Sequence, residues 1–154
     1  MARAIAIPEL SAPREPRQLF LGYAAIKRIA ERTGLPFNEA FARLWRRSAA
    51  DHLIVNAHLL VVFLWAALHR EHPRQPDTYL WVDLGEEPVA ALVDAYCSGG
   101  PEPFFDREAT LLMRLIDAAY QAGLLRRPAA DGTGAEEARG APDPPTAVDG
   151  ATTP

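Results

Sequence analysis

The chain has 154 residues, which is enough for one domain and too few for two. Hydrophobic residues make up 49% and charged residues 23% of it, a balance that excludes a wholly disordered or collagen-like chain. The single cysteine, Cys97, excludes an intramolecular disulfide framework. The N-terminus lacks the long apolar core of a secretory signal, and the apolar stretch from Leu53 to Leu68 is shorter than the roughly 20 residues that span a bilayer. We therefore expect a cytoplasmic, single-domain protein without a membrane segment.

Charge is distributed unevenly along the chain. The formal net charge is −4, but residues 1–50 carry an excess of five positive charges and residues 51–154 an excess of nine negative ones. Six side chains supply most of the positive excess: Lys27, Arg28, Arg32, Arg43, Arg46 and Arg47. A basic face on an acidic body favours a polar partner, although a solvated surface that binds nothing explains the pattern equally well.

The C-terminal segment differs in composition from the rest of the chain. Residues 128–154 consist almost entirely of Ala, Gly, Pro, Thr, Asp and Glu, and Val148 is their only large aliphatic residue. Such a segment cannot bury enough apolar surface to offset an ordering entropy of about 1–2 kcal/mol per residue. We therefore predict a disordered tail over 128–154, a helical domain over 18–127, and an irregular, proline-containing lead-in over 1–17.

Between these ends the hydrophobic periodicity is mainly helical. The run from Arg17 to Leu21 can form a short strand, and Gly22 precedes a first helix that ends at Thr33-Gly34. A second helix is expected, with Asn38 as its cap. Its apolar side chains recur at helical spacing: Phe37, Ala40, Phe41, Leu44 and Trp45.

The third predicted helix is the most apolar element of the chain. It is expected to begin at Asp51 and to run to about His72, where Pro73 stops it. From Leu59 to Leu68 it is apolar nearly all round, which predicts the central helix against which the others pack. The aromatic segment that follows, residues 77–82, is expected to be a loop or a short strand.

Two further helices begin at acidic residues. Asp83 and Glu86 have capping-box spacing and open a fourth helix, and Asp106 caps a fifth. The inner face of the fourth consists of Val89, Leu92, Val93, Tyr96 and Cys97. The inner face of the fifth consists of Leu111, Leu112, Leu115, Ile116, Ala119 and Tyr120. The predicted fold class is therefore mainly α: a compact bundle of about five helices around a central buried helix, with one or two short strands.

The sequence contains no catalytic motif that we recognise, such as a Gly-rich phosphate loop, a Gly-x-Ser-x-Gly elbow or a dinucleotide fingerprint. Cys97 lies on an apolar helix stripe and is expected to be a core residue rather than a nucleophile. His69 and His72 have a helical spacing that suits one metal ion, but no third ligand is evident, and complementing the negative end of a helix explains them better. We predict a protein that is not an enzyme and holds neither cofactor nor metal.

Residues 25–47 are similar in pattern to a helix-turn-helix, with arginines that suit phosphate contacts. Two observations count against DNA binding. Arg43 occupies a position where the motif needs an apolar side chain, and the acidic chain as a whole weakens attraction to DNA. A small DNA-binding regulator is therefore an alternative function, an unclassified helical adaptor or small enzyme is another, and nucleic acid is not the partner that we expect.

Three segments follow one another in a characteristic order. Leu19 to Gly34 combines a strand-like start with a helix that ends in Thr-Gly, Val62 to Pro73 is strongly apolar, and Glu86 to Asp94 belongs to an amphipathic helix opened by acidic residues. In this order the segments resemble the tail assembly chaperones of long-tailed bacteriophages and related gene transfer agents. The resemblance covers about residues 19–95.

The resemblance implies a non-enzymatic function. Members of this family bind the long, helical tape measure protein, keep its apolar surfaces from aggregating and help to recruit tail tube protein subunits during virion assembly. A chaperone of this kind acts in the host-cell cytoplasm, and a homo-oligomer is compatible with the role. It needs an apolar groove or helix face rimmed by charge. The partner-binding residues that we expect are Arg43, Trp45, Arg46, Arg47, Tyr79 and Trp81, with a core position as the alternative for the tryptophans.

Overall fold

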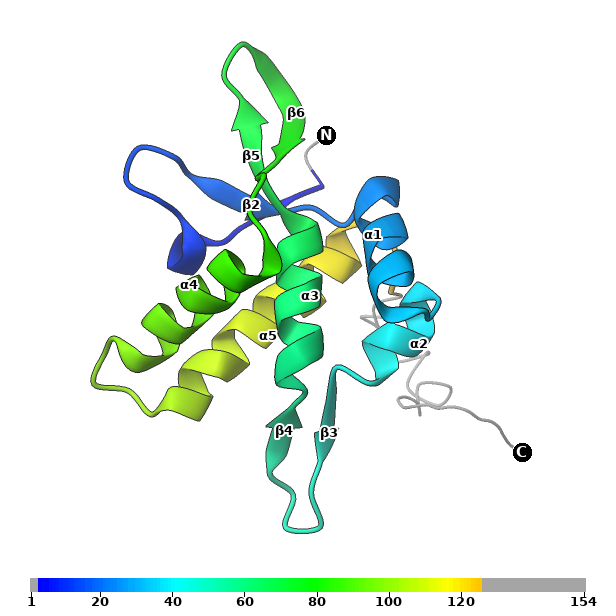
Figure 1. The fold of residues 1–154 in the computed structure, drawn as a ribbon, viewed down its shortest axis with the longest axis vertical. Coiled ribbons are helices and arrows are strands. Elements are labelled where there is room, and N and C mark those ends of the chain that lie inside the picture. Colours follow the sequence, from blue (N-terminus) through cyan, green and yellow to red (C-terminus); the bar gives the residue numbers. More distant parts are fainter. Residues whose placement is uncertain (1–2, 126–154) are drawn as a thin grey trace, which may run out of the picture. The chain divides into compact units, whose positions relative to one another are not determined.

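The computed structural model describes residues 3–125, and they form a mixed α/β fold (Figure 1). The helices are η1 (Pro8–Leu10), α1 (Tyr23–Thr33), α2 (Phe37–Ala42), α3 (Ala57–Ala67), α4 (Glu86–Ser98) and α5 (Phe104–Gln121). The strands are β1 (Ile5–Ala6), β2 (Arg17–Leu19), β3 (Trp45–Arg47), β4 (Leu53–Val55), β5 (Leu68–His72) and β6 (Gln75–Trp81). The prediction of a mainly α bundle is therefore wrong, because two antiparallel sheets accompany the helices. The predicted disordered tail lies outside the described residues.

Helix α3 occupies the centre of the fold, as its composition predicts. Helices α1, α4 and α5 all pack against it. Seven of its eleven residues are buried. Among them, Phe63 is fully buried, and its ring packs against the rings of Phe37 and Phe41. A helix that is apolar all round is stable only in such surroundings, because each of its faces must leave water.

The predicted helix from Asp51 to His72 is instead a strand, a helix and a strand. Asn56, not Asp51, caps α3, because its side-chain oxygen accepts a hydrogen bond from the backbone N–H of Leu59 (3.1 Å). At the other end, the carbonyl of Ala67 accepts a hydrogen bond from the N–H of Phe20 (2.8 Å) instead of continuing the helical ladder. The helix therefore ends against strand β2, and the chain continues as β5.

The larger sheet has the strand order β1-β2-β5-β6, and every neighbouring pair is antiparallel. Leu19 of β2 lies opposite Leu68 of β5, and His69 of β5 lies opposite Trp81 of β6. The sheet lies at the C-terminal end of α3, and the β3–β4 hairpin lies at the N-terminal end (Figure 1). Residues 17–21, which could form a short strand, contain β2, and residues 77–82, expected as a loop or a short strand, contain most of β6, whereas the other strands were not predicted.

The predicted irregular lead-in, residues 1–17, contributes to the core over its described part. Ile7, which precedes η1, and Leu10, the last residue of η1, are almost completely buried. The N–H of Ile7 donates to the carbonyl of Arg17 (3.1 Å), which extends the β1–β2 pairing. The prolines of this segment shape a compact connection that belongs to the folded body.

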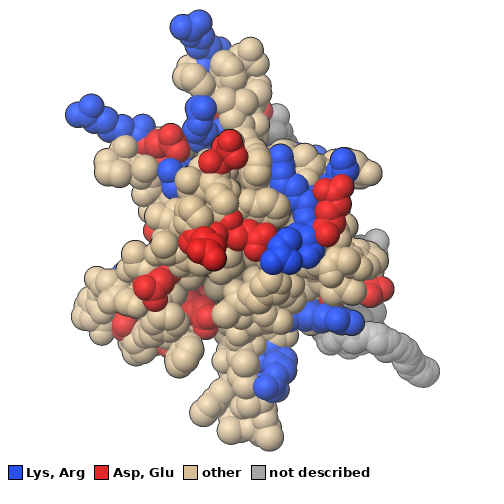
Figure 2. Space-filling model, in the orientation of Figure 1, with Lys and Arg blue, Asp and Glu red and all other residues tan. Residues whose placement is uncertain are grey.

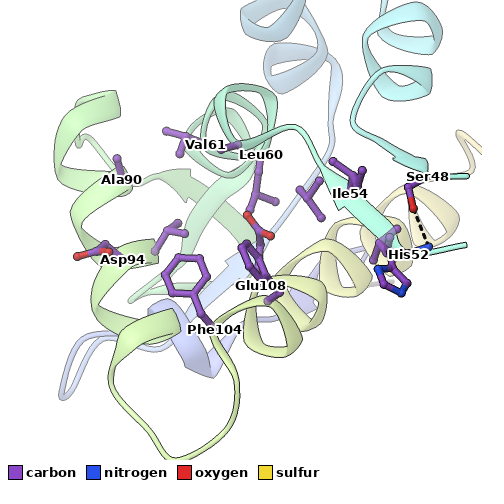
Figure 3. A pocket seen from close by; sticks show the side chains of 14 residues that line it. Ser48, His52, Ile54, Leu60, Val61, Ala90, Asp94, Phe104 and Glu108 are labelled. Carbon is purple, nitrogen blue, oxygen red and sulfur yellow. Dashed lines mark hydrogen bonds between the residues drawn. The ribbon is translucent and has the colours of Figure 1, made fainter. Parts of the chain in front are cut away.

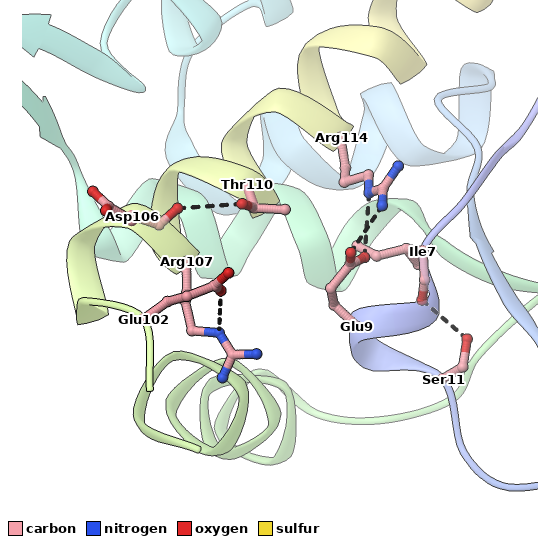
Figure 4. Close-up of polar contacts among 8 residues, drawn as sticks. All are labelled: Ile7, Glu9, Ser11, Glu102, Asp106, Arg107, Thr110 and Arg114. Atoms are coloured by element: carbon pink, nitrogen blue, oxygen red, sulfur yellow. Dashed lines mark hydrogen bonds and ion pairs between the residues drawn. The ribbon is translucent and has the colours of Figure 1, made fainter. Parts of the chain in front are cut away.

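Two arginines of α5 hold neighbouring segments in place (Figure 4). Arg114 donates two hydrogen bonds to the carboxylate of Glu9 on η1, at 3.2 and 2.8 Å. Arg107 donates to the carbonyl of Tyr96 (2.9 Å), stacks on the Tyr96 ring and forms an ion pair with Glu102 (3.4 Å). These contacts fix both η1 and the α4–α5 connection against α5.

The first predicted helix is confirmed as α1. It ends at Thr33, and Gly34 adopts a left-handed conformation with φ of 74°, which glycine reaches without a Cβ clash. The second predicted helix is shorter than its apolar pattern indicates. It ends at Ala42, and Trp45 lies on β3, because the N–H of Asn56 donates to the carbonyl of Leu44 (2.8 Å) and draws the two chain segments into a hairpin.

The predicted starts of the last two helices also differ from the structure. Helix α4 begins after Gly85 rather than at Asp83, and α5 begins two residues before Asp106. Glu86 does not close a capping box, since its carboxylate pairs with Arg32 of α1 at 2.6 Å. Among residues 3–125, no helix has both the length and the apolar character needed to cross a bilayer.

Candidate functional site

Four of the six predicted partner-binding residues lie on the β3–β4 hairpin and beside it, and we call them the cationic patch: Arg43, Trp45, Arg46 and Arg47. Arg43 is the C-terminal cap of α2, and the exposed Arg46 and Arg47 lie on β3. Trp45 is half-buried with its ring edge-on to Phe41, at 5.4 Å between ring centres. The patch therefore combines exposed guanidinium groups, of which that of Arg47 pairs with Asp51 (3.9 Å), with a tryptophan that also packs on the core.

The other two predicted partner-binding residues, Tyr79 and Trp81, form an aromatic patch on the edge strand β6. Tyr79 packs on Phe20, and the Trp81 indole N–H donates to the carbonyl of Trp65 (3.0 Å). Arg28 stacks over the Trp81 ring at 3.9 Å. Both aromatic side chains are half-buried and have partners within the fold.

The structure does not bring the two predicted patches together. The hairpin precedes α3 and β6 lies beyond its far end, so the eleven-residue helix, about 16 Å long, separates them. In the view of Figure 2, Lys and Arg side chains are spread over several elements, including the free end of the β5–β6 hairpin, while Asp and Glu predominate over α4. The basic excess of residues 1–50 thus forms no single continuous face in this view.

The described part of the chain contains a hollow that was not predicted. It lies between the β3–β4 hairpin, α3, α4 and the first turns of α5, with a volume of about 720 Å³ (Figure 3). Its lining is mainly apolar and includes Leu53, Ile54, Leu60, Val61, Val93 and Phe104. We call it the α3–α5 groove. A smaller hollow of about 440 Å³ lies against Trp45, Arg46 and Ile54 and so shares the hairpin.

Exposed phenylalanines border the α3–α5 groove. Phe104 and Phe105 open α5 and are 39% and 73% exposed, and Ile54 of the hairpin is 37% exposed. The start of α5, with Phe104 and Phe105, is held by the contacts of Arg107 with Tyr96 and Glu102. A Cβ atom on Gly100 in the α4–α5 connection would collide with the Arg107 guanidinium. A rigidly held apolar surface that remains in contact with water is typical of a protein-binding site.

Glu108 is the unusual residue of the groove. It is only 9% exposed, yet it has no hydrogen bond or ion pair with any other residue of the described range 3–125. Figure 3 shows its carboxylate directed into the groove, between α3 and Phe104. Burial raises the pKa of Glu108 above the ordinary value of 4.5, because the charged form loses solvation that no partner replaces.

The raised pKa of Glu108 predicts a pH-dependent stability. The folded state binds the proton more tightly than the unfolded state, so the free energy of unfolding falls as pH rises through 4.5 towards the raised pKa. We expect Glu108→Gln to increase the free energy of unfolding at pH 7 by about 0.5–1 kcal/mol and to leave it unchanged near pH 4. Urea denaturation at both pH values measures this, with Asp94→Asn as an exposed control. A loss of stability at pH 7 would mean that the carboxylate has a stabilising partner.

The sequence held one signal of this site. Glu108 shares a helical stripe with Phe104, Leu111 and Leu115, so a carboxylate stands on the inner face of an amphipathic helix. Nothing in the local pattern indicates that the β3–β4 hairpin would lie across from it.

The histidine and helix-turn-helix hypotheses depended on helices that the structure replaces with strands. His69 and His72 both lie on β5, with a β-bulge between Glu71 and His72, so they do not have the helical spacing on which the metal hypothesis rested. His69 is buried with Nδ1 at 2.8 Å from the carbonyl of Ala67, and desolvation lowers its pKa. Arg46 and Arg47 lie on β3, outside the six-residue helix α2 that would have to enter a DNA groove. Among residues 3–125, no three His, Cys, Asp or Glu side chains are grouped to hold a metal ion.

Neither a protein-family model, nor a curated protein, nor a solved structure matches the chain. The resemblance to tail assembly chaperones therefore stays a hypothesis based on three sequence segments. The structure places them on β2 and α1, on the end of α3 with β5, and on the first part of α4. Helix α3 contacts both α1 and α4, so the three segments belong to one packed unit.

Proposed function

We propose that this protein is a non-enzymatic chaperone that holds an apolar helical segment of a client protein in the α3–α5 groove. The observation that carries this proposal is the continuity between the apolar groove and the exposed side chains of Phe104, Phe105 and Ile54. An amphipathic helix laid into such a groove would cover both surfaces at once. A small ligand inside the groove would leave the outward-facing Phe105 in water.

The sequence resemblance supplies the proposed client. Tail assembly chaperones bind the tape measure protein, whose long helices present apolar stripes before the tail is assembled. Of the three segments that carry the resemblance, the one on α4 contributes Ala90, Val93 and Asp94 to the lining of the groove. We therefore propose the tape measure protein as client and the tail tube protein as the partner recruited afterwards, in the host-cell cytoplasm.

The cationic patch has a supporting role in this proposal. Arg43, Trp45 and Arg46 line the smaller hollow, and Ile54 borders both hollows. Cationic groups at the edge of an apolar site favour one orientation of a charged partner and speed the encounter more than they add affinity. Arg46 and Arg47 are thus proposed to orient the client rather than to hold it.

Co-expression of the tagged full chain with the products of its neighbouring genes, among which we expect a tape measure protein, tests the proposal. We expect the two proteins to co-purify, and we expect Phe105→Ser to reduce the yield of client about tenfold or more, because a central aromatic anchor is lost. Tyr23→Ser is the matched control, since Tyr23 is 83% exposed on α1 and lies outside the groove.

Two results would contradict the proposal. One is a chain that does not retain the tape measure protein, and the other is equal retention by both serine variants. Binding to duplex DNA that weakens at moderate salt and on replacement of Arg46 and Arg47 by alanine would favour the DNA-binding regulator instead.

A further inference from the structure

We propose that the α3–α5 groove is specific for a helix that presents a lysine or arginine within its apolar face, and that Glu108 is the carboxylate that pairs with this cation. The inference rests on the proposed function and adds the chemistry by which the groove selects its client segment. It accounts for a nine-tenths buried glutamate whose carboxylate, directed into the groove, has no hydrogen bond or ion pair with another residue of the range 3–125.

The position of Glu108 suits this role. It lies one turn after Phe104 on α5, and its carboxylate is directed into the groove opposite α3 (Figure 3). The apolar neighbours Leu60 and Val93 offer it no hydrogen bond. A carboxylate that faces a hollow rather than the closed core can be neutralised only by a proton or by a cation that enters the hollow.

The other ionisable groups at the groove have complementary or neutral character towards a cation. Asp94 of α4 adds a second carboxylate, His52 lies on the turn of the hairpin, and no lysine or arginine lines the groove. Arg107 is adjacent to Glu108 in the chain but is directed to Tyr96 and Glu102. The groove is therefore apolar with a negative centre.

Three other occupants fit the groove less well. A small amine would neutralise Glu108 but would leave Phe105 uncovered. Residues 128–154 of the chain have no aromatic side chain and a net negative charge, so they match neither property of the groove. A second copy would have to insert an exposed apolar stripe, but away from the groove its large exposed apolar side chains among residues 3–125 are the separate Tyr23 on α1 and Met113 on α5.

A client helix would satisfy all of these properties. Large apolar residues at positions i, i+3 or i+4 and i+7 would cover the apolar walls and Phe105. A lysine or arginine at one of these positions would extend its aliphatic stem along the wall and place its charge on Glu108. Truncating one partner of such a charge pair in an interface typically costs tenfold in affinity or more.

Overlapping 20-residue peptides that cover the tape measure protein recovered in the co-purification provide the probe. Binding is measured by fluorescence anisotropy with the full chain and with Glu108→Gln. Glu87→Gln is the charge-matched control, because Glu87 is exposed in the first turn of α4 and does not line the groove. For each peptide that binds, the basic residue of its apolar face is also replaced by methionine.

We expect the binding peptides to carry such a basic residue, Glu108→Gln to weaken them about tenfold, and Glu87→Gln to leave them unchanged. Replacing the basic residue of the peptide by methionine should weaken its binding to the unmodified chain about tenfold. It should not weaken the binding to Glu108→Gln any further. Equal binding by Glu108→Gln, or tight peptides without a basic residue, would overturn the inference while the proposed function stands. The inference would also be overturned, with the proposed function standing, if the chain co-purifies with the tape measure protein but binds none of the peptides. It would likewise be overturned if Glu108→Gln abolishes a dimer of the chain instead of peptide binding. Failure of co-purification itself would overturn the proposed function.

Discussion

Replacing Phe63 with alanine should lower the free energy of unfolding by about 3–5 kcal/mol, the usual cost of removing a buried phenyl ring. Phe63 is fully buried at the middle of α3, and its ring packs at 5.8 Å from Phe37 and 6.1 Å from Phe41, measured between ring centres. The alanine leaves a cavity between α3 and α2 that the rigid backbone cannot close. Urea denaturation followed by circular dichroism measures the change.

Phe105→Ala is the matched control for this substitution. The same atoms are removed, but Phe105 is 73% exposed, so we expect a change within about 0.5 kcal/mol. Equal losses for the two variants would show that α3 is not the centre of the core.

Replacing Arg114 with alanine should lower the free energy of unfolding by about 2 kcal/mol, because it leaves the Glu9 carboxylate without its partner. The Glu9 side chain is only 13% exposed, and both of its oxygens accept a hydrogen bond from Arg114. The substitution should also increase hydrogen exchange at the backbone N–H of Leu10, which closes η1. Chemical denaturation and exchange mass spectrometry test the two expectations.

Lys27→Ala provides the comparison for Arg114→Ala. Lys27 and Glu31 form an exposed pair on α1 at 3.8 Å, with about two-thirds of each side chain in solvent, and such pairs contribute well under 1 kcal/mol. If Arg114→Ala costs no more than Lys27→Ala, η1 is held by its apolar residues and not by this ion pair.

The parts of the fold that depend on local sequence could be predicted. Helix α1 was recognised with its end at Gly34, where a left-handed residue is needed, and α3 was recognised as the central helix from its apolar composition. The buried stripe of α4 was also predicted in part: Val89, Val93 and Cys97 are buried, whereas the other two members are half-buried. In each case neighbours within a few positions determine the structure.

The strands could not be predicted in the same way, because each depends on a partner outside its own segment, across a hairpin for β3–β4 and β5–β6 and far along the chain for β2 and β5. Residues 68–72 follow directly on the apolar helix, and pairing with β2, some fifty positions earlier, and with β6 makes them a strand. Short apolar runs are ambiguous between buried helix and buried strand. The same ambiguity placed Trp45 at the end of a helix rather than in the β3–β4 hairpin.

The groove was missed because it is assembled from segments that are far apart in the chain. Leu53 and Ile54 come from a hairpin that the sequence pattern represented as helix, and Phe104 and Glu108 come from a helix beyond the family resemblance. Tyr79 and Trp81 were predicted to bind a partner because they are aromatic, but their side chains pack on Phe20 and on α3. Composition identified binding-prone residue types, and only the tertiary structure distinguishes the packed ones from the free ones.

Photo-crosslinking tests most directly whether the client occupies the α3–α5 groove. A photoreactive benzoylphenylalanine replaces Phe105 in one variant and Tyr23 in another, since both positions are well exposed and only Phe105 belongs to the groove. Each variant is irradiated after co-expression with the tape measure protein, and the products are mapped by mass spectrometry. We expect a crosslink from position 105 to an apolar helical segment of the client and none from position 23. Crosslinks from position 23 alone, or equal crosslinks from both, would contradict the account.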